Sequence, residues 1–280
     1  MNIKITSDST CDLPASVLEQ YHIDLVPLIV MKEDEEFLDN VTITPGDIFA
    51  HVENGGALCS TAARSVAVYQ ELFSKFAGDY DEVLHISLGS GFSSSCQNAN
   101  LAAQSFSNVR VLDSQSLSSG HGLMVLKAAQ LSQEGMALEN ILEELEAYRS
   151  KIDISFVLDR LDYMAKGGRC STATALGANL LNLKPCIELR DGKMSVGKKY
   201  RGHFDKCLTH YIQDKLGSQE EIDHSVLLLT HTQVDDQIIA AVREAIAQFA
   251  PFETVYEAEA GCTVSCHCGP NTLGIIFARV

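Results

Sequence analysis

The sequence predicts an α/β fold of two domains, in which a mostly parallel N-terminal sheet has helices on both of its faces. In the first half of the chain, short apolar strand patterns, small polar loops and helical patterns follow one another, as they do in parallel sheets. In the second half, hairpin signals such as Asp191-Gly192 interrupt this alternation. The 280 residues suit one large or two moderate domains. We therefore expect one α/β domain over residues 1–150 and a second over residues 151–280.

The first half opens with a predicted strand at residues 3–6. Asp12 is placed to cap a helix that runs to about residue 22, and a strand follows at 24–30. Ser60 and Thr61 precede a helical pattern at 62–76. The remaining elements of this half are strands at 82–87 and 109–112 and helices at 93–106, 118–134 and 138–150, the last two separated by Gly135.

The second half mixes strands, short helices and turns. Its predicted strands are at 154–158, 185–189, 193–196, 226–230 and 254–257. Its predicted helices are at 161–165, 171–181, 203–216 and 234–249. Two closing strands are expected on either side of the turn signal Gly269-Pro270-Asn271.

Composition limits the functional classes. No apolar run reaches the ~18 residues of a membrane span, and the N-terminus lacks a signal-peptide pattern, so we expect a cytoplasmic protein. The net charge of −16 argues against general nucleic-acid binding. Nine scattered cysteines without framework spacing are interpreted as small buried thiols in a reducing compartment.

The charge is unevenly distributed. The segment 166–206 contains nine basic residues against three acidic ones and is therefore about +6, which leaves about −22 on the rest of the chain. Its basic residues are Lys166, Arg169, Lys184, Arg190, Lys193, Lys198, Lys199, Arg201 and Lys206. This segment is either a solvated face or a docking surface for an acidic partner or a phosphate.

Three clusters rich in hydroxyl groups fall at predicted strand ends, where α/β folds bind ligands. They are residues 7–10 (Ser-Asp-Ser-Thr), Ser60-Thr61, and residues 89–95 (Gly-Ser-Gly-Phe-Ser-Ser-Ser). The first two are equally well explained as capping or turn residues. The third is a Gly-rich turn that opens a helix and exposes backbone N–H groups to an anion, but it is neither a P-loop nor G-x-G-x-x-G.

Cys262, Cys266 and Cys268 surround His267 near the end of the chain and suggest a zinc site. If the segment is a strand, Cys266 and Cys268 share one face while His267 points to the other, and no second C-x-x-C pair exists. We therefore expect no metal and interpret His267 as a core histidine or as one that faces the other domain.

Catalytic classes find little support in the sequence. No serine lies in a G-x-S-x-G frame, which argues against a hydrolase elbow. Asp8, Asp113 and Asp159 are not grouped as the Mg²⁺ ligands that a phosphotransferase needs.

Motifs along the whole chain resemble those of the DegV family. They lie at residues 7–12, 60–61, 86–93, 113–122, 161–169, 184–185, 191–202 and 267–274. Residues 166–169, for example, are the K-G-G-R of that family, and residues 267–274 are similar to its H-x-G-P-G-T-x-G. Any one segment is a weak signal, but eight segments in the family's order are a strong one.

The resemblance implies two α/β domains of the DegV type, with a long-chain fatty acid in an apolar tunnel between or adjoining them. It implies the fatty-acid-binding subunit of a bacterial fatty acid kinase, with no catalytic residue, metal or cofactor of its own. A separate ATP-binding kinase subunit would phosphorylate the bound carboxylate, and the acyl phosphate would enter phospholipid synthesis.

The same resemblance assigns roles to particular residues. The expected carboxylate ligands are Thr61, Ser93, Ser60 and His267, with Ser94, Gly91 and Ser119 as further loop contributors. The expected kinase-docking residues are Arg169, Arg201 and Lys166. The physics agrees, because each buried CH₂ gains ~0.8 kcal/mol and a carboxylate taken out of water needs hydrogen-bond donors.

Two other classes stay open at this point. A serine-dependent acyl hydrolase or transferase would form a covalent adduct on a loop serine such as Ser93, whereas the resemblance implies a site without a nucleophile–base pair. A lipid-sensing regulatory module would bind a partner without ligand turnover. Transient contact with a membrane surface is compatible with the carrier hypothesis.

Overall fold

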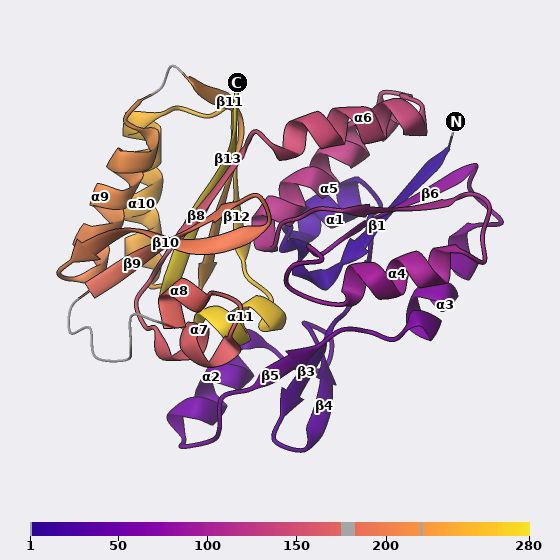
Figure 1. Cartoon of the computed structure of the whole chain (residues 1–280). Helices are drawn as coiled ribbons and strands as arrows, with labels where there is room; N and C mark the ends of the chain where they lie inside the picture. The colour runs from indigo at the N-terminus through magenta and orange to yellow at the C-terminus, as the bar shows by residue number, and fades with distance from the viewer. Residues whose placement is uncertain (1, 175–182, 219–220) are drawn as a thin grey trace.

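The computed structural model describes residues 2–174, 183–218 and 221–280, and in it two sheets face one another across a central helix (Figure 1). The N-terminal sheet is fully parallel in the order β2-β1-β6-β7. Its strands are β1 (Ile3–Asp8), β2 (Asp24–Val26), β6 (Glu82–Ser87) and β7 (Val109–Asp113). The prediction of an α/β fold with a parallel N-terminal sheet is confirmed.

Helices cover both faces of this sheet because its strands are apolar on both sides. The 3-10 turn η1 (Ser9–Cys11), α1 (Ala15–Gln20), α5 (Ser118–Gln133) and α6 (Leu138–Arg149) pack on one face. The helices α3 (Val66–Phe76) and α4 (Ser95–Ala103) pack on the other. The carboxyl ends of β1 and β6 therefore open toward the second half of the molecule, where a ligand site is expected.

The second sheet is mixed, with the order β10-β9-β8-β13-β11-β12, and only β11 and β12 are parallel neighbours. Its strands are β8 (Ile152–Leu158), β9 (Leu183–Arg190), β10 (Lys193–Arg201), β11 (Ile222–Thr232), β12 (Thr254–Glu259) and β13 (Thr272–Arg279). One face packs against α9 (Phe204–Leu216) and α10 (Asp236–Phe249). The short helices α7 (Asp162–Gly167), α8 (Ser171–Thr174) and α11 (Cys262–Cys268) lie at the end of the sheet nearest the cavity described below.

The central helix α5 joins the two halves. Twelve of its sixteen residues are buried, and its cluster includes side chains from both sheets. Two glycines allow α5 to pack this closely against both halves. A Cβ at Gly120 would lie 2.3 Å from the Ile154 side chain, and one at Gly122 would lie 2.3 Å from the Cys11 carbonyl oxygen. Because this core crosses the middle of the chain, the boundary at residue 150 stays a prediction.

Several predicted elements are wrong. Asp12 is not the N-cap of α1 but ends η1 in a left-handed conformation with φ 46°, and α1 starts after Pro14. The predicted strand 24–30 is divided into β2 and β3 (Ile29–Lys32). The part of the predicted helix 171–181 that covers residues 175–181 lies outside the described residues.

The largest error concerns Ser60-Thr61, which lies in β5 (Ser60–Ala62) and not at a helix N-terminus. With β3 and β4 (Glu35–Leu38), β5 forms a three-stranded antiparallel sheet that the sequence analysis missed, together with α2 (Pro45–Glu53). Its strands contain only three or four residues each, too few for periodicity to register. No helix in the described ranges is long and apolar enough to cross a membrane.

Candidate ligand-binding site

A cavity of about 330 Å³ lies between the two halves, within the size range of small-molecule sites. Its apolar lining comes from loops and short elements of both halves. The apolar side chains are Leu28, Leu88, Phe92, Leu117, Phe156, Met164, Met194 and Val264. A further cavity of about 30 Å³ shares Leu117, Phe156, Val264 and Cys268 with it, so the apolar lining continues inward. This lining suits a flexible apolar ligand.

A polar cluster interrupts the apolar lining. The Thr61 hydroxyl and His267 Nε2 are 2.8 Å apart, although 206 positions separate them in the chain. Strand alternation explains why Thr61 faces the cavity while Ser60 is exposed on the opposite face of β5. Thr61 and His267 therefore join a strand of the first half to a helix of the second half.

His267 is held by α11, a helix where the sequence predicted a strand. The β-branched Thr263 and Val264 favoured the strand assignment. Two buried carboxylates reverse it: Asp39 Oδ1 accepts a hydrogen bond from the Cys262 N–H at 2.7 Å, and Asp12 Oδ1 accepts one from the Gly261 N–H at 2.8 Å. Side-chain oxygens that accept hydrogen bonds from the first N–H groups stabilise the start of a helix, and only the tertiary structure brings these two side chains there.

Asp12 connects three parts of the molecule. Its carboxylate also accepts a hydrogen bond from the Ser118 hydroxyl at 2.6 Å, so it joins η1, α5 and α11. Burial raises the pKa of Asp12 to about 7, although the hydrogen bonds from Ser118 and Gly261 oppose this shift. Near neutral pH, the Asp12 carboxyl group is therefore partly protonated in the folded protein.

The electrostatics around His267 keep its imidazole neutral. Burial and, to a smaller extent, the positive charge of Arg169 lower the pKa of His267 to about 4. The K-G-G-R segment packs closely here, because a Cβ at Gly167 would lie 2.3 Å from His267 Nδ1. At neutral pH, His267 can therefore hydrogen-bond to an anion but does not neutralise its charge.

The loop 88–94 forms the wall opposite α11. Ser93 and Ser94 line the cavity, and the Ser93 hydroxyl accepts a hydrogen bond from the Ser95 N–H at 3.2 Å. The loop is anchored where Asp113 accepts hydrogen bonds from the Ser90 N–H and hydroxyl, at 3.0 and 2.5 Å. These anchors fix the position of Ser93 before any ligand arrives.

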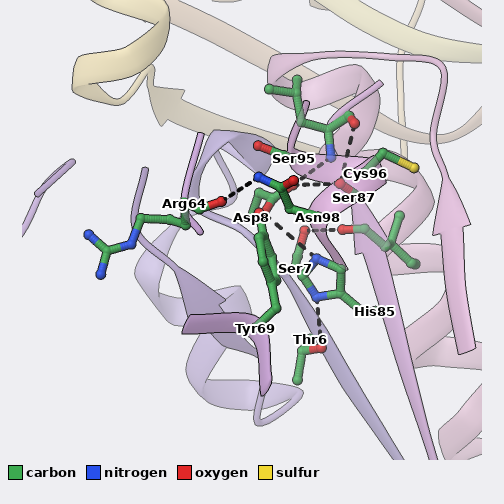
Figure 2. Close-up of polar contacts among 12 residues, drawn as sticks. Thr6, Ser7, Asp8, Arg64, Tyr69, His85, Ser87, Ser95, Cys96 and Asn98 are labelled. Atoms are coloured by element: carbon green, nitrogen blue, oxygen red, sulfur yellow. Dashed lines mark hydrogen bonds and ion pairs between the residues drawn. The ribbon is translucent and has the colours of Figure 1, made fainter. Parts of the chain in front are cut away.

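A fully buried network around Asp8 supports the same loop (Figure 2). Its carboxylate accepts hydrogen bonds from the Tyr69 hydroxyl at 2.6 Å and from the Ser87 hydroxyl and the Leu88 N–H, both at 2.8 Å. His85 Nε2 lies 3.6 Å away. Burial alone would raise the pKa of Asp8, but His85 and Tyr69 lower it to about 2. Asp8 is therefore an ionised structural anchor, not a ligand group.

The structure brings together five of the residues singled out from the sequence. Thr61, Ser93, Ser94, His267 and Arg169 line the cavity, so Arg169 belongs to the site as well as to the basic segment.

Three others lie outside the cavity lining. Ser60 is exposed, and Gly91 approaches the β9–β10 turn, where its Cβ would lie 3.1 Å from the Gly192 carbonyl oxygen. Ser119 is fully buried and hydrogen-bonds to Thr230 at 2.5 Å. Gly91 and Ser119 therefore hold the halves of the molecule together.

Lys166, Arg169 and Arg201 are exposed on α7, the turn after it and the end of β10. Within the described ranges, none of the three forms an ion pair, whereas Lys184 pairs with Asp159 at 2.5 Å and Lys198 with Asp214 at 2.5 Å. The first three charges are thus available to a partner.

Comparisons with known proteins agree with this architecture. The family model of uncharacterised DegV-family proteins matches residues 2–280. The chain belongs to the DegV family. It is 32% identical to a DegV domain-containing protein of Deinococcus radiodurans over 278 residues, or 98% of each chain.

Solved DegV structures share the fold over the full chain length. A DegV family protein from Thermus thermophilus, whose structure is described as showing fatty acid binding, is 31% identical with a TM-score of 0.91, and all of both chains is covered. DegV of Bacillus subtilis, described as a fatty acid binding protein, is 25% identical with a TM-score of 0.85, again over all of both chains.

The nine cysteines of this DegV chain all lie in the described ranges, and all of them are buried. Cys59 and Cys266 interact directly, and the hydrogen bond from Cys266 lowers the pKa of Cys59 to about 7 against the effect of burial. Among the described residues, no group of three His, Cys, Asp or Glu side chains is placed to hold a metal ion.

The Thr61–His267 contact joins two of the expected carboxylate ligands and places a hydroxyl beside an imidazole, the arrangement from which a nucleophile–base pair could be built. The direct contact between them is visible only in the tertiary structure. A catalytic base is usually held by a third group, but His267 Nδ1 is buried without a hydrogen-bond partner in the described chain. With a pKa of about 4, His267 is also a weak base at neutral pH.

Sequence reasoning also missed Thr10 and Thr263, which line the cavity beside His267. Thr10 was noticed only as part of a capping loop. Thr263 precedes His267 by four residues, a spacing that places both on one helix face. Assigning residues 262–268 to a helix would have revealed it.

Proposed function

We propose that this DegV protein binds a long-chain fatty acid in the cavity and presents its carboxylate to a separate ATP-binding kinase subunit. The observation that supports this most strongly is the composition of the cavity: an apolar lining with a neutral, hydrogen-bonding cluster of Thr61, Ser93 and His267. The fatty acid binding described for the Thermus thermophilus and Bacillus subtilis relatives supports the ligand class.

The apolar tail and the carboxylate are recognised by different means. Each CH₂ transferred from water to the lining contributes about 0.8 kcal/mol. The carboxylate needs donors, which the hydroxyls of Thr61 and Ser93 and the His267 imidazole supply. Because His267 is uncharged, the carboxylate keeps its negative charge and its reactivity toward a phosphoryl donor.

Three exposed basic side chains support the second part of the proposal, the presentation of the carboxylate to a kinase subunit. Lys166, Arg169 and Arg201 lie on the segment that contrasts with an otherwise acidic chain, and Arg169 also lines the cavity. A kinase subunit with an acidic surface would be guided to the carboxylate by these charges. We place the protein in the cytoplasm on the same hypothesis.

Two variants distinguish fatty acid binding from presentation of the carboxylate to the kinase subunit. His267→Ala should weaken the binding of hexadecanoic acid about tenfold, since it removes a hydrogen bond to a charged group. Arg201→Ala should leave that affinity within about twofold but lower kinase-dependent acyl phosphate formation about tenfold. The exposed Arg110 on β7 provides the control, because Arg110→Ala should change neither quantity.

The ligand itself can be identified by native mass spectrometry of the protein before and after delipidation. A co-purified long-chain acid is expected. A bare chain mass in every preparation, with no acid recovered by extraction, would contradict the proposal. Equal losses of affinity and phosphorylation in Arg201→Ala would contradict the division between cavity and docking surface.

The Thr61–His267 pair is the one observation that favours an acyl hydrolase or transferase instead. That hypothesis predicts covalent labelling of Thr61 or Ser93 by an active-site-directed phosphonate. An unmodified protein in intact-mass analysis would contradict the hydrolase or transferase hypothesis. A lipid-sensing module, in contrast, would bind its partner equally well after Thr61→Ala and Ser93→Ala.

A further inference from the structure

Two hydroxyl groups in the cavity wall have no hydrogen-bond partner among the described residues: those of Thr10 and Thr263. Their side chains are only 1% and 6% exposed. Two other buried hydroxyls have partners, since Ser118 donates to Asp12 and Thr232 donates to the Gly269 carbonyl oxygen. An unsatisfied buried hydroxyl costs about 1–3 kcal/mol, so two in one cavity wall indicate a missing polar partner.

The two hydroxyls belong to segments that are fixed against each other. Thr10 lies in η1, two residues before Asp12, and Thr263 lies in the first turn of α11, two residues after Gly261. The hydrogen bond from the Gly261 N–H to Asp12 Oδ1, at 2.8 Å, ties these segments together. Thr10 and Thr263, which we call the polar patch, therefore lie on adjoining segments of the cavity wall.

Helix geometry gives the position of this patch relative to His267, one of the residues proposed to bind the carboxylate. Thr263 and His267 are four residues apart on α11 and face the same cavity. One helical turn rises about 5.4 Å, so the patch lies about one turn from the group that holds the carboxylate. An acyl chain whose carboxylate contacts His267 and which runs toward the first turn of α11 passes Thr263 within its first few carbons.

We propose that Thr10 and Thr263 form a second polar subsite, which recognises a hydroxyl group near the carboxyl end of the acyl chain, as in long-chain β-hydroxy acids. The inference rests on the proposed function, because it takes the carboxylate position from there. A plain methylene chain leaves both threonine hydroxyls without a partner. A β-hydroxyl donates to one of them and accepts from the other, because a hydroxyl group does both.

The test compares three ligands on the delipidated full-length chain by calorimetry: hexadecanoic acid, β-hydroxyhexadecanoic acid and ω-hydroxyhexadecanoic acid. The ω-isomer has the same polarity but places its hydroxyl at the apolar end. The β-isomer should bind about tenfold more tightly than the ω-isomer. Equal affinities of the two isomers would overturn the subsite, and would be the result if an ordered water satisfied both threonines.

Substitutions at Thr10 and Thr263 test whether these residues cause the preference for the β-isomer. Thr263→Val and Thr10→Val keep the side-chain shape, and each should lower the β-to-ω affinity ratio toward one. Thr263→Ser should retain the ratio, and Thr209→Val on the exposed face of α9 is the matched control. A ratio that persists in both valine variants would overturn the assignment.

Failure of the two proposals can be distinguished. If hexadecanoic acid does not bind, the proposed function itself fails. If hexadecanoic acid binds and the isomers do not differ, only the subsite fails.

Discussion

Two hydroxyl-rich regions of this protein look alike in the sequence and differ in the structure. One is the opening motif, residues 7–12, and the other is the carboxylate cluster of Thr61, Ser93 and His267. In the opening motif, Ser7, Asp8, Ser9 and Asp12 all have partners within the protein. In the carboxylate cluster, the hydroxyls lie in a cavity wall and are open to a ligand.

The difference shows that a polar motif at a strand end has two possible uses. When its groups are paired internally, it fixes the position of other elements, as Asp8 fixes the Leu88 backbone and Asp12 fixes the start of α11. When its groups face a cavity, it binds a ligand. Thr10 is part of the opening motif in the sequence, but in the structure it lines the cavity. The opening motif therefore contains both internally paired residues and a cavity residue.

The strongest test of the structural role is Asp8→Ala. It leaves the donors of Tyr69, Ser87 and Leu88 buried without an acceptor, and should lower the free energy of unfolding by about 3–5 kcal/mol. Urea unfolding measures this, and Tyr69→Phe, which removes one donor, should cost only about 1 kcal/mol. A loss below about 1 kcal/mol in Asp8→Ala would show that the motif is not an internal anchor.

A second test uses the raised pKa of Asp12. In the unfolded chain an Asp titrates near pH 4, whereas in the folded protein burial raises the pKa of Asp12 to about 7. Between these values the folded state keeps a proton that the unfolded state loses. The contribution of Asp12 to stability is therefore fully present below about pH 4 and is lost as the pH rises through about 7.

Asp12→Asn removes this titration. The stability of the wild type relative to Asp12→Asn should fall by on the order of 2 kcal/mol between about pH 5 and about pH 8. Thermal unfolding at the two pH values measures the difference, and Asp34→Asn in the exposed β3–β4 turn is the control. A difference that does not change with pH would mean that Asp12 is ionised throughout.

The third test concerns the approach of α7 to His267. Gly167→Ala places a Cβ where only 2.3 Å separates it from His267 Nδ1, so the imidazole must leave the position in which it contacts Thr61. Hexadecanoic acid binding should weaken about tenfold, as expected for loss of one charge-assisted hydrogen bond. Gly78→Ala, where a Cβ meets no atom of the described residues within 4 Å, should have no effect.

The smallest expected effect is the difference in hexadecanoic acid affinity between substitutions of two adjacent residues, Ser60 and Thr61. Ser60→Ala should change hexadecanoic acid affinity by less than about twofold because the side chain is exposed, whereas Thr61→Val should weaken it about fivefold. Comparable losses in the two variants would show that β5 rearranges when the ligand binds.

The sequence by itself determined much of the fold and singled out several residues that line the cavity. Alternating apolar segments with polar ends predicted β6 at its observed bounds, 82–87, and Asp191-Gly192, both with positive φ, predicted the β9–β10 hairpin. These features are local: they depend on periodicity and on turn conformations that neighbouring residues specify. The motifs that include Thr61, Ser93 and His267 were also visible in the chain.

Only the tertiary structure decided which polar residues remain open to a ligand. The segment 262–268 becomes a helix because Asp12 and Asp39, more than 200 positions away, accept hydrogen bonds from its first N–H groups. Ser119 and Gly91 resemble site residues in the sequence, yet they are used in contacts between the halves. Whether a hydroxyl is paired or free depends on long-range neighbours, and no local pattern records them.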